Sequence, residues 1–141
     1  MKTADFNKLE LSAVWYEADP TMRAKVDFPF FGGTGNKSSS VVYFEVEPGH
    51  RLGTHTDSAE EILLILAGAI EADLGQEQGQ LSAGQAVLIP AMVPHGLRNA
   101  GPVTARCVGF FSAAAVASTF DQPMMPFGQR TVGTPPVERA A

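Results

Sequence analysis

The sequence predicts an all-β domain, folded as a sandwich or a barrel, on three observations. Mostly apolar segments of about five to eight residues recur between positions 38 and 112. Several of them alternate apolar and polar side chains, which is typical of a strand with one buried face. Glycine and proline separate the segments, as turns require. Residues 113–120 are the one candidate helix, with a continued strand as the alternative.

The individual strands follow from local patterns. Val42, Phe44 and Val46 fall on one face of the first strand because side chains alternate along a strand. The segment 61–66 is apolar on both faces, which favours a strand buried on both sides. A turn over residues 75–79 indicates a hairpin. The predicted strands are, in chain order, residues 40–47, 61–66, 70–74, 85–90 and 104–112.

The length and composition suit a single domain. The chain has 141 residues, of which 45% are hydrophobic and 18% charged, so it can close one core. We expect residues 1–37 to form an N-terminal arm and strands that join the barrel, and residues 38–120 to form the barrel itself. Residues 121–141 are predicted to be an extended tail, either unstructured or packed over the barrel or onto a second subunit.

Charge and cysteine content limit the partners and the compartment. A net charge of −5 without a run of Lys or Arg argues against nucleic acid and anionic membranes as partners. No apolar segment has the length that spans a bilayer, and the first residues lack the apolar core of a signal peptide. Cys107 is the single cysteine, which suits a reducing environment. The sequence therefore predicts a cytoplasmic protein with a small-molecule ligand or substrate.

Four side chains form the strongest candidate site. His55 and Asp57 are two residues apart, so on a strand they face the same side. Glu61 begins the next strand after a short bend, and His95 ends a different strand. If these strands pair, the four groups meet at one point. Imidazoles and carboxylates together suit one divalent transition metal: iron, manganese, nickel, copper or zinc.

Two longer motifs carry a resemblance to the cupin superfamily. The first motif is Gly49, His55, Asp57, Glu61 and Gly68, and the second is Gly84, Pro90, Met92, His95 and Asn99. Every spacing of the superfamily pattern is kept. The resemblance implies a double-stranded β-helix, or jelly-roll barrel, in a small single-domain protein. It also implies a metal near one mouth of the barrel, with His55, Glu61 and His95 as matching ligands.

The sequence departs from that pattern at Asp57, where the superfamily has a second histidine, and at Met92, where it has a glycine. Three outcomes are open for Asp57. It ligates the metal directly, it reaches the metal through water, or the site is weak or empty. The second outcome leaves two histidines and one carboxylate, the ligand set of non-haem Fe(II) oxygenases.

Four further residues are candidates for the substrate pocket: His50, Met92, Arg106 and Phe127. His50 is expected on the barrel rim, as an exposed side chain, a substrate contact or a replacement ligand. Met92 is expected to narrow the mouth. Either Arg106 or its neighbour Cys107 faces the interior, and an inward arginine would hold an anionic group.

The leading functional hypothesis is a metal-dependent enzyme, in its first form an Fe(II)-type dioxygenase acting on a small organic substrate. A metal-dependent isomerase or lyase is the nearest variant. A non-catalytic binding or sensing protein and a purely structural barrel are the alternatives, since a fold alone does not determine a reaction. A homodimer is expected from the apolar segment 61–66 and the apolar tail.

Overall fold

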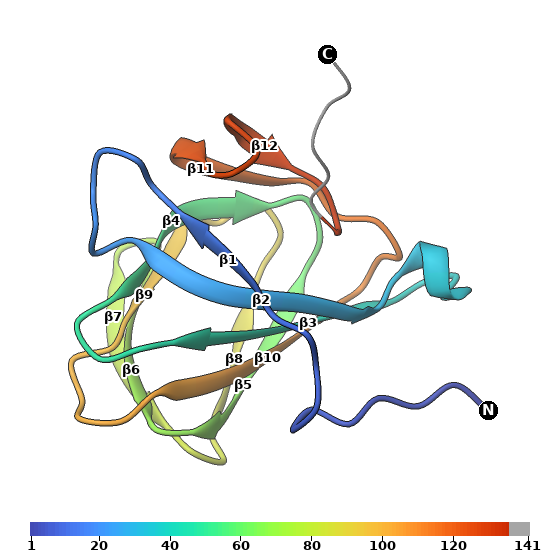
Figure 1. Cartoon of the computed structure of the whole chain (residues 1–141), viewed down its shortest axis with the longest axis horizontal. Coiled ribbons are helices and arrows are strands. Elements are labelled where there is room, and N and C mark those ends of the chain that lie inside the picture. The colour runs from blue at the N-terminus through green and yellow to red at the C-terminus, as the bar shows by residue number, and fades with distance from the viewer. Residues whose placement is uncertain (136–141) are drawn as a thin grey trace.

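The computed structural model describes residues 1–135, which fold into two six-stranded antiparallel sheets that face each other (Figure 1). The first sheet has the order β1-β2-β3-β10-β5-β8 and the second the order β12-β11-β4-β9-β6-β7. The first sheet contains β1 (Ser12–Trp15), β2 (Arg23–Phe30), β3 (Ser40–Val46), β10 (Ala105–Phe111), β5 (Glu61–Ala67) and β8 (Ala86–Ile89). The second contains β12 (Gln129–Val132), β11 (Ser118–Met124), β4 (Arg51–Asp57), β9 (His95–Arg98), β6 (Ala69–Leu74) and β7 (Glu77–Ser82). The all-β jelly-roll prediction is confirmed.

The core lies between the two sheets, and alternation along the strands fills it. The β3 side chains of Val42, Phe44 and Val46 are all buried, as their spacing predicts. On the facing sheet, Ile70 and Leu97 contribute to the same cluster. Within residues 1–135 no helix has the length and apolarity to cross a membrane.

Two local predictions differ from the structure: the burial of the segment 61–66 on both faces, and the candidate helix over residues 113–120. The outer side chains of β5, Ile62 and Leu66, are exposed, so this strand is buried on one face only. Residues 113–120 form no helix: residues 113–117 are irregular, and from Ser118 the strand alternative holds, because Ser118 pairs with Asp57 of β4. A short 3₁₀ helix, η1 (Gly32–Thr34), interrupts the chain between β2 and β3.

The segment that begins at Asp121 is not an extended tail over its first part. It completes β11 and forms β12, and the two strands form a hairpin at the edge of the second sheet (Figure 1). Met124 and Val132 from this hairpin are buried in the core. The packed alternative for the tail is therefore the observed one up to residue 135, and the rest of the predicted tail lies outside the described residues.

Candidate metal centre

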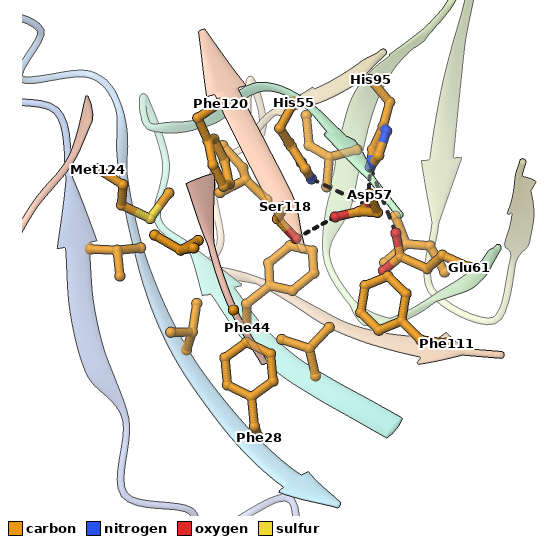
Figure 2. A pocket seen from close by; sticks show the side chains of 18 residues that line it. Phe28, Phe44, His55, Asp57, Glu61, His95, Phe111, Ser118, Phe120 and Met124 are labelled. Atoms are coloured by element: carbon orange, nitrogen blue, oxygen red, sulfur yellow. Dashed lines mark hydrogen bonds and ion pairs between the residues drawn. The ribbon is translucent and has the colours of Figure 1, made fainter. Parts of the chain in front are cut away.

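A cavity between the sheets is apolar along most of its wall and polar at one end (Figure 2). The polar end carries His55, Asp57, Glu61, His95 and Ser118. The remaining wall comes from both sheets and consists of Val14, Val26, Phe28, Val42, Phe44, Leu52, Leu63, Leu97, Phe111, Phe120, Met124, Val132 and Gly133. An apolar chamber with a few convergent polar groups is the usual form of a small-molecule site.

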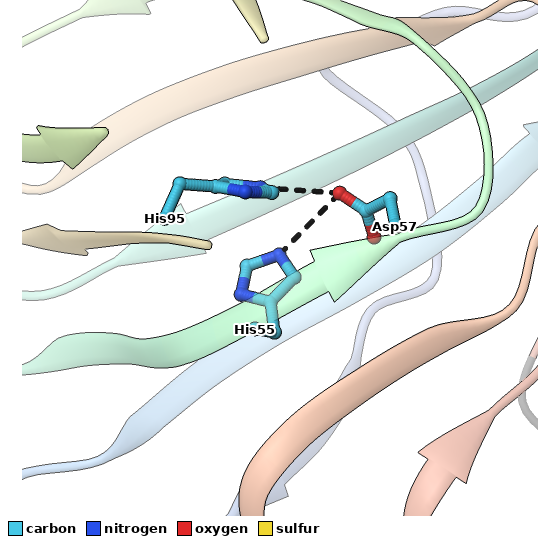
Figure 3. A group of neighbouring side chains, drawn as sticks. All are labelled: His55, Asp57 and His95. Atoms are coloured by element: carbon cyan, nitrogen blue, oxygen red, sulfur yellow. Dashed lines mark ion pairs between the residues drawn. The ribbon is translucent and has the colours of Figure 1, made fainter. Parts of the chain in front are cut away.

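Three of the predicted ligands converge at that end (Figure 3). Ligand atoms of His55, Asp57 and His95 all lie within 4.8 Å of one another, and all three side chains are buried. The Oδ2 atom of Asp57 is 3.1 Å from His95 Nε2 and 3.7 Å from His55 Nε2. The carboxylate that replaces a histidine in the motif therefore reaches the common point of the two imidazoles.

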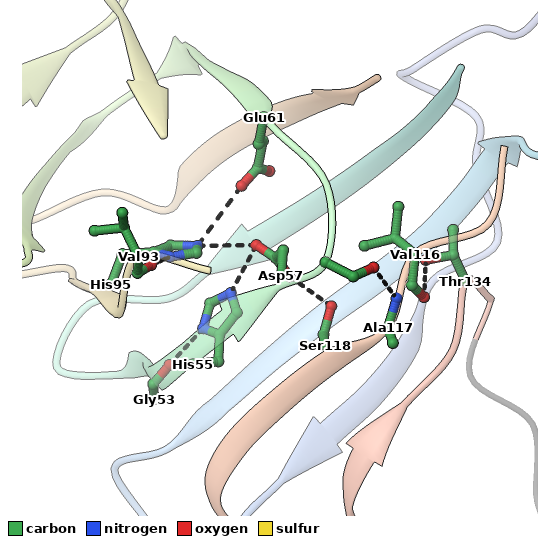
Figure 4. A network of polar contacts seen from close by, with 11 residues as sticks. Gly53, His55, Asp57, Glu61, Val93, His95, Val116, Ala117, Ser118 and Thr134 are labelled. Atoms are coloured by element: carbon green, nitrogen blue, oxygen red, sulfur yellow. Dashed lines mark hydrogen bonds and ion pairs between the residues drawn. The ribbon is translucent and has the colours of Figure 1, made fainter. Parts of the chain in front are cut away.

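Each imidazole is held through the nitrogen that faces away from this point (Figure 4). Nδ1 of His55 lies 2.8 Å from the Gly53 carbonyl, and Nδ1 of His95 lies 2.9 Å from the Val93 carbonyl. In the neutral form with the proton on Nδ1, which is the form that binds a metal, each ring donates to its carbonyl and has an unprotonated Nε2. The Phe120 ring stacks on His55, with centroids 4.4 Å apart and planes at 18°, and limits its rotation.

Ser118 holds the Asp57 carboxylate through the oxygen atom that the histidines do not contact. Its hydroxyl donates a hydrogen bond to Asp57 Oδ1 at 2.5 Å, which directs Oδ2 toward the histidines. Among the described residues, buried Asp57 Oδ2 and His95 Nε2 have no well-aligned hydrogen-bond partner. The two atoms face each other 3.1 Å apart without good hydrogen-bond geometry, so a metal bound between them would give each a well-directed partner. Two imidazoles and a carboxylate oxygen fit a first-row divalent metal.

Glu61 belongs to the site but lies outside the converging triad. Its Oε1 is 3.7 Å from His95 Nε2, and the carboxyl is buried beside Gly109 of β10. A Cβ at position 109 would lie 2.0 Å from Glu61 Oε2, so only glycine leaves room for this carboxyl. Its role as a ligand stays a prediction.

Burial and the charges of their neighbours shift the pKa values of these four side chains in different directions. Burial and the neighbouring His95 lower the pKa of His55 to about 4. Burial also opposes charge on His95, yet Asp57 and Glu61 raise its pKa to about 10. Burial raises the pKa of Glu61, whereas His95 and His55 hold the pKa of Asp57 below its usual value despite its burial. The metal-free site thus contains one imidazolium, on His95, beside ionised Asp57.

The stability of the metal-free protein is expected to fall as pH rises above about 6.5. Folded His95 keeps its proton up to a pKa of about 10, whereas unfolded histidine loses it near 6.5. The unfolded state then binds fewer protons, so the unfolding free energy decreases by up to about 1.4 kcal/mol per pH unit. Urea unfolding with a chelator between pH 6.5 and 8.5 measures this slope. His95→Gln should remove most of it, and an unchanged slope would contradict the assignment.

None of the four predicted substrate-pocket residues lines the cavity. Arg106 points to the outer face, where it contacts the Tyr43 hydroxyl and the N-terminal arm, while Cys107 is the buried neighbour. The outward position follows from strand alternation, because the core takes Cys107. His50 precedes β4, and Phe127 packs partly buried against the core between β11 and β12.

Met92 is 61% exposed and stands in the left-handed region with φ of 65°. Its backbone N–H donates to the Asp57 carbonyl at 2.8 Å, so the turn is joined to the end of β4. A side chain in this conformation costs about 1–2 kcal/mol relative to glycine. Met92→Gly is therefore expected to stabilise the fold by about 0.5–1 kcal/mol in thermal or urea unfolding. Met92→Ala retains the Cβ and should give no gain in stability. Equal effects of the glycine and alanine substitutions would contradict backbone strain at Met92 as the cause.

Sequence reasoning missed Ser118, Phe120 and Gly109, which hold Asp57, His55 and Glu61 respectively. Ser118 and Phe120 face the site because β11 pairs with β4, in the registers Ser118↔Asp57 and Phe120↔His55. No spacing within the two motifs carries this information. The glycine in the apolar segment 104–112 was the one available signal, since glycine within a strand often marks a close approach.

Comparison with known proteins places this site in context. The family described as "Cupin domain" matches residues 42–111. Protein SchB of Streptomyces halstedii is 44% identical over 64 residues, covering 45% of this chain and 46% of that protein. Polyketide synthase CurC of Streptomyces cyaneus is 35% identical over 71 residues, which cover 50% of this chain and 46% of that protein. The chain thus spans under half the length of these relatives.

The polyketide cyclase RemF of Streptomyces resistomycificus has a similar structure, with a TM-score of 0.65 at 19% identity. The likeness covers 79% of this chain and 78% of that one. At this level of identity it shows a shared fold.

Proposed function

Because the chain belongs to the cupin superfamily, we propose that it is a metal-dependent enzyme that acts on a small, largely aromatic substrate. One observation carries the proposal: donor atoms of His55, Asp57 and His95 converge at the single polar end of an apolar cavity. A structural barrel has no need of three buried, converging ligand groups, since removing ionisable side chains from water costs free energy even when they are paired.

A metal held by His55, Asp57 and His95 would act as a Lewis acid that polarises a carbonyl or enolate oxygen. The residues supply the other functions. The phenylalanines of the wall, among them Phe44 and Phe111, contact the apolar part of the substrate. Glu61 exchanges a proton with the substrate, since its buried carboxyl has a raised pKa and faces the cavity outside the triad.

The substrate class is that of aromatic, polyketone-like compounds. Support comes from the phenylalanine-rich wall and from the relative named a polyketide synthase. Such molecules combine a planar apolar body with carbonyl or enol oxygens, which matches an apolar chamber with one metal-binding end. The reaction class is cyclisation or a related isomerase or lyase step that begins with removal of a proton from the carbon next to a carbonyl. In a cyclisation, the resulting enolate carbon attacks a second carbonyl carbon of the same molecule, whose oxygen then takes up a proton.

An Fe(II) dioxygenase is the second candidate, because two histidines and one carboxylate are the ligand set of non-haem Fe(II) oxygenases. Protein loaded with Zn²⁺ or Fe²⁺ separates the two when it is incubated with poly-β-ketones, diketones and catechols. Turnover with Zn²⁺ and without oxygen uptake supports the Lewis-acid reaction. Oxygen uptake with Fe²⁺ alone supports the oxygenase. Saturable binding without turnover by either form would favour a non-catalytic binding protein.

Glu61→Gln tests the role of Glu61 within this proposal. A proton-exchanging residue should leave metal content near that of the wild type while turnover falls by about 10²–10⁴-fold. Loss of the metal together with the activity would instead make Glu61 a ligand, as the motif resemblance implies.

A homodimer through the outer face of the first sheet is part of the same proposal. Leu88, Ile62 and Phe110 are direct cross-strand neighbours there, exposed by 54%, 49% and 44%. These three side chains are uncharged. Two copies of the chain, each with a net charge of −5, can therefore pack through them without bringing like charges together. Sedimentation should give a dimer for the wild type and a folded monomer for Ile62→Asp; a monomeric wild type at all concentrations would contradict it.

A further inference from the structure

A β-bulge turns His55 into the site. In the pairing of β4 with β9, Leu52 faces Leu97 and His55 faces His95, so two β4 residues, Gly53 and Thr54, stand opposite a single residue. In a regular strand, positions 52 and 55 point to opposite faces. Here both Leu52 and His55 line the cavity. The extra residue therefore reverses the alternation and brings His55, and Asp57 after it, inside.

Tyr16 occupies the space beside this bulge. A Cβ at Gly53 would lie 2.3 Å from the Tyr16 hydroxyl oxygen, so that hydroxyl fills the place of a side chain. Tyr16 is 2% exposed and follows β1 directly. Its hydroxyl donates a hydrogen bond to Asp121 of β11 at 2.5 Å. One phenol thus joins the end of β1, the bulge of β4 and the neighbouring strand β11.

The same bulge residue orients the metal-binding ring. The Gly53 carbonyl lies 2.8 Å from His55 Nδ1, so the position of Gly53 determines where Nε2 points (Figure 4). Phe120, adjacent to Asp121 on β11, stacks on His55 and meets Tyr16 edge to face. The guanidinium of Arg51, paired with Asp19 at 2.7 Å, lies over the Tyr16 ring at 5.8 Å and covers it.

We infer that Tyr16 and Asp121 are positioning residues, which hold the Gly53 bulge so that His55 presents Nε2 to the metal centre. The inference rests on the proposed metal-dependent function. Neither residue lines the cavity, so both act through Gly53 and not by contact with substrate. Groups that orient a metal-binding histidine typically change metal affinity by 10–100-fold when removed.

Tyr16→Phe tests the inference because it keeps the ring and removes the hydroxyl. We expect Zn²⁺ affinity, measured by calorimetry, to fall by about 10–100-fold. Tyr43→Phe is the matched control, since Tyr43 is equally buried and donates to the Glu45 carboxylate at 2.6 Å, away from the site. That variant should bind Zn²⁺ like the wild type. Equal affinity in both variants would overturn the inference.

A second readout uses the metal-free protein. Side-chain ¹⁵N NMR should show the His55 proton on Nδ1 in the wild type and Tyr43→Phe, and a mixture of tautomers in Tyr16→Phe. A single Nδ1–H form in all three would overturn the inference. Because this measurement needs no metal, it still tests the positioning if the wild type fails to bind Zn²⁺, a result that would refute only the proposed function.

Substitutions at Asp121 keep the test decisive if Tyr16→Phe does not fold. Asp121→Asn retains an acceptor oxygen for the Tyr16 hydroxyl, so Zn²⁺ affinity should stay within about threefold of the wild type. Asp121→Ala removes the acceptor and should reproduce the loss of at least tenfold. Equal Zn²⁺ affinity in the alanine variant and the wild type would overturn the role of Asp121.

Discussion

Replacing His95 by alanine is expected to abolish metal retention and to weaken the fold. Its Nε2 lies 3.1 Å from Asp57 and 3.7 Å from Glu61, at the centre of the site. Without the imidazole, a metal loses one of three converging ligands and two buried carboxyl groups lose their common partner. Breaking such a buried charge arrangement costs about 3–5 kcal/mol. Metal analysis after purification without a chelator and urea unfolding of the metal-free protein measure the two effects.

His50→Ala is the matched control for this variant. His50 is also a histidine of the first motif region, but it lies outside the cavity and precedes β4. It should retain the metal content and the stability of the wild type. If His95→Ala kept its metal, or if His50→Ala lost it, the assignment of the site would be wrong.

Gly109→Ala should displace Glu61 and destabilise the protein by about 2–4 kcal/mol. The new Cβ would lie 2.0 Å from Glu61 Oε2 and 2.8 Å from Val42 Cγ1, both within the core. Overpacking of a well-filled core costs about 1–3 kcal/mol, and the displaced buried carboxyl adds to it. Urea unfolding measures the loss, and turnover of the metal-loaded protein should fall with it.

Gly79→Ala and a double variant serve as controls for Gly109→Ala. Gly79 lies on β7 with no atom near its Cβ position, so its substitution should be close to neutral. Glu61→Ala combined with Gly109→Ala removes the closest contact and should recover part of the stability lost in the single variant. No recovery in the double variant would mean that Glu61 does not explain the need for glycine at position 109.

Strand alternation is local, so the sequence was sufficient to predict an all-β sandwich or barrel. The jelly-roll barrel with a metal near one mouth was implied by the resemblance of the two motifs to the cupin superfamily. Val42, Phe44 and Val46 are buried as their spacing predicts. His55, Asp57 and His95 converge, whereas the motif resemblance implied His55, Glu61 and His95 and left the role of Asp57 open. The groups that hold the ligands in place could not be predicted. Ser118 reaches the site through the pairing of β11 with β4, and Tyr16 reaches Gly53 through side-chain packing from the end of β1. Sequence spacing carries no information about either contact.

The same reason explains the wrong predictions about surfaces. An apolar run such as residues 61–66 looks alike whether a second layer covers its outer face or not, and here the outer face is exposed. Likewise, the parity of Arg106 and Cys107 on β10 was known to be opposite, but only the sheet arrangement decides that Cys107 faces the core.

The metal content of protein purified without a chelator tests the central claim most directly. A site built by His55, Asp57 and His95 should contain close to one divalent transition metal per chain. Removing that metal and adding back Fe²⁺, Mn²⁺, Ni²⁺ or Zn²⁺ should raise the melting temperature with one equivalent, since ligands that bind only the folded state stabilise it. Protein that contains no metal, and whose melting temperature none of these ions raises, would contradict the metal centre.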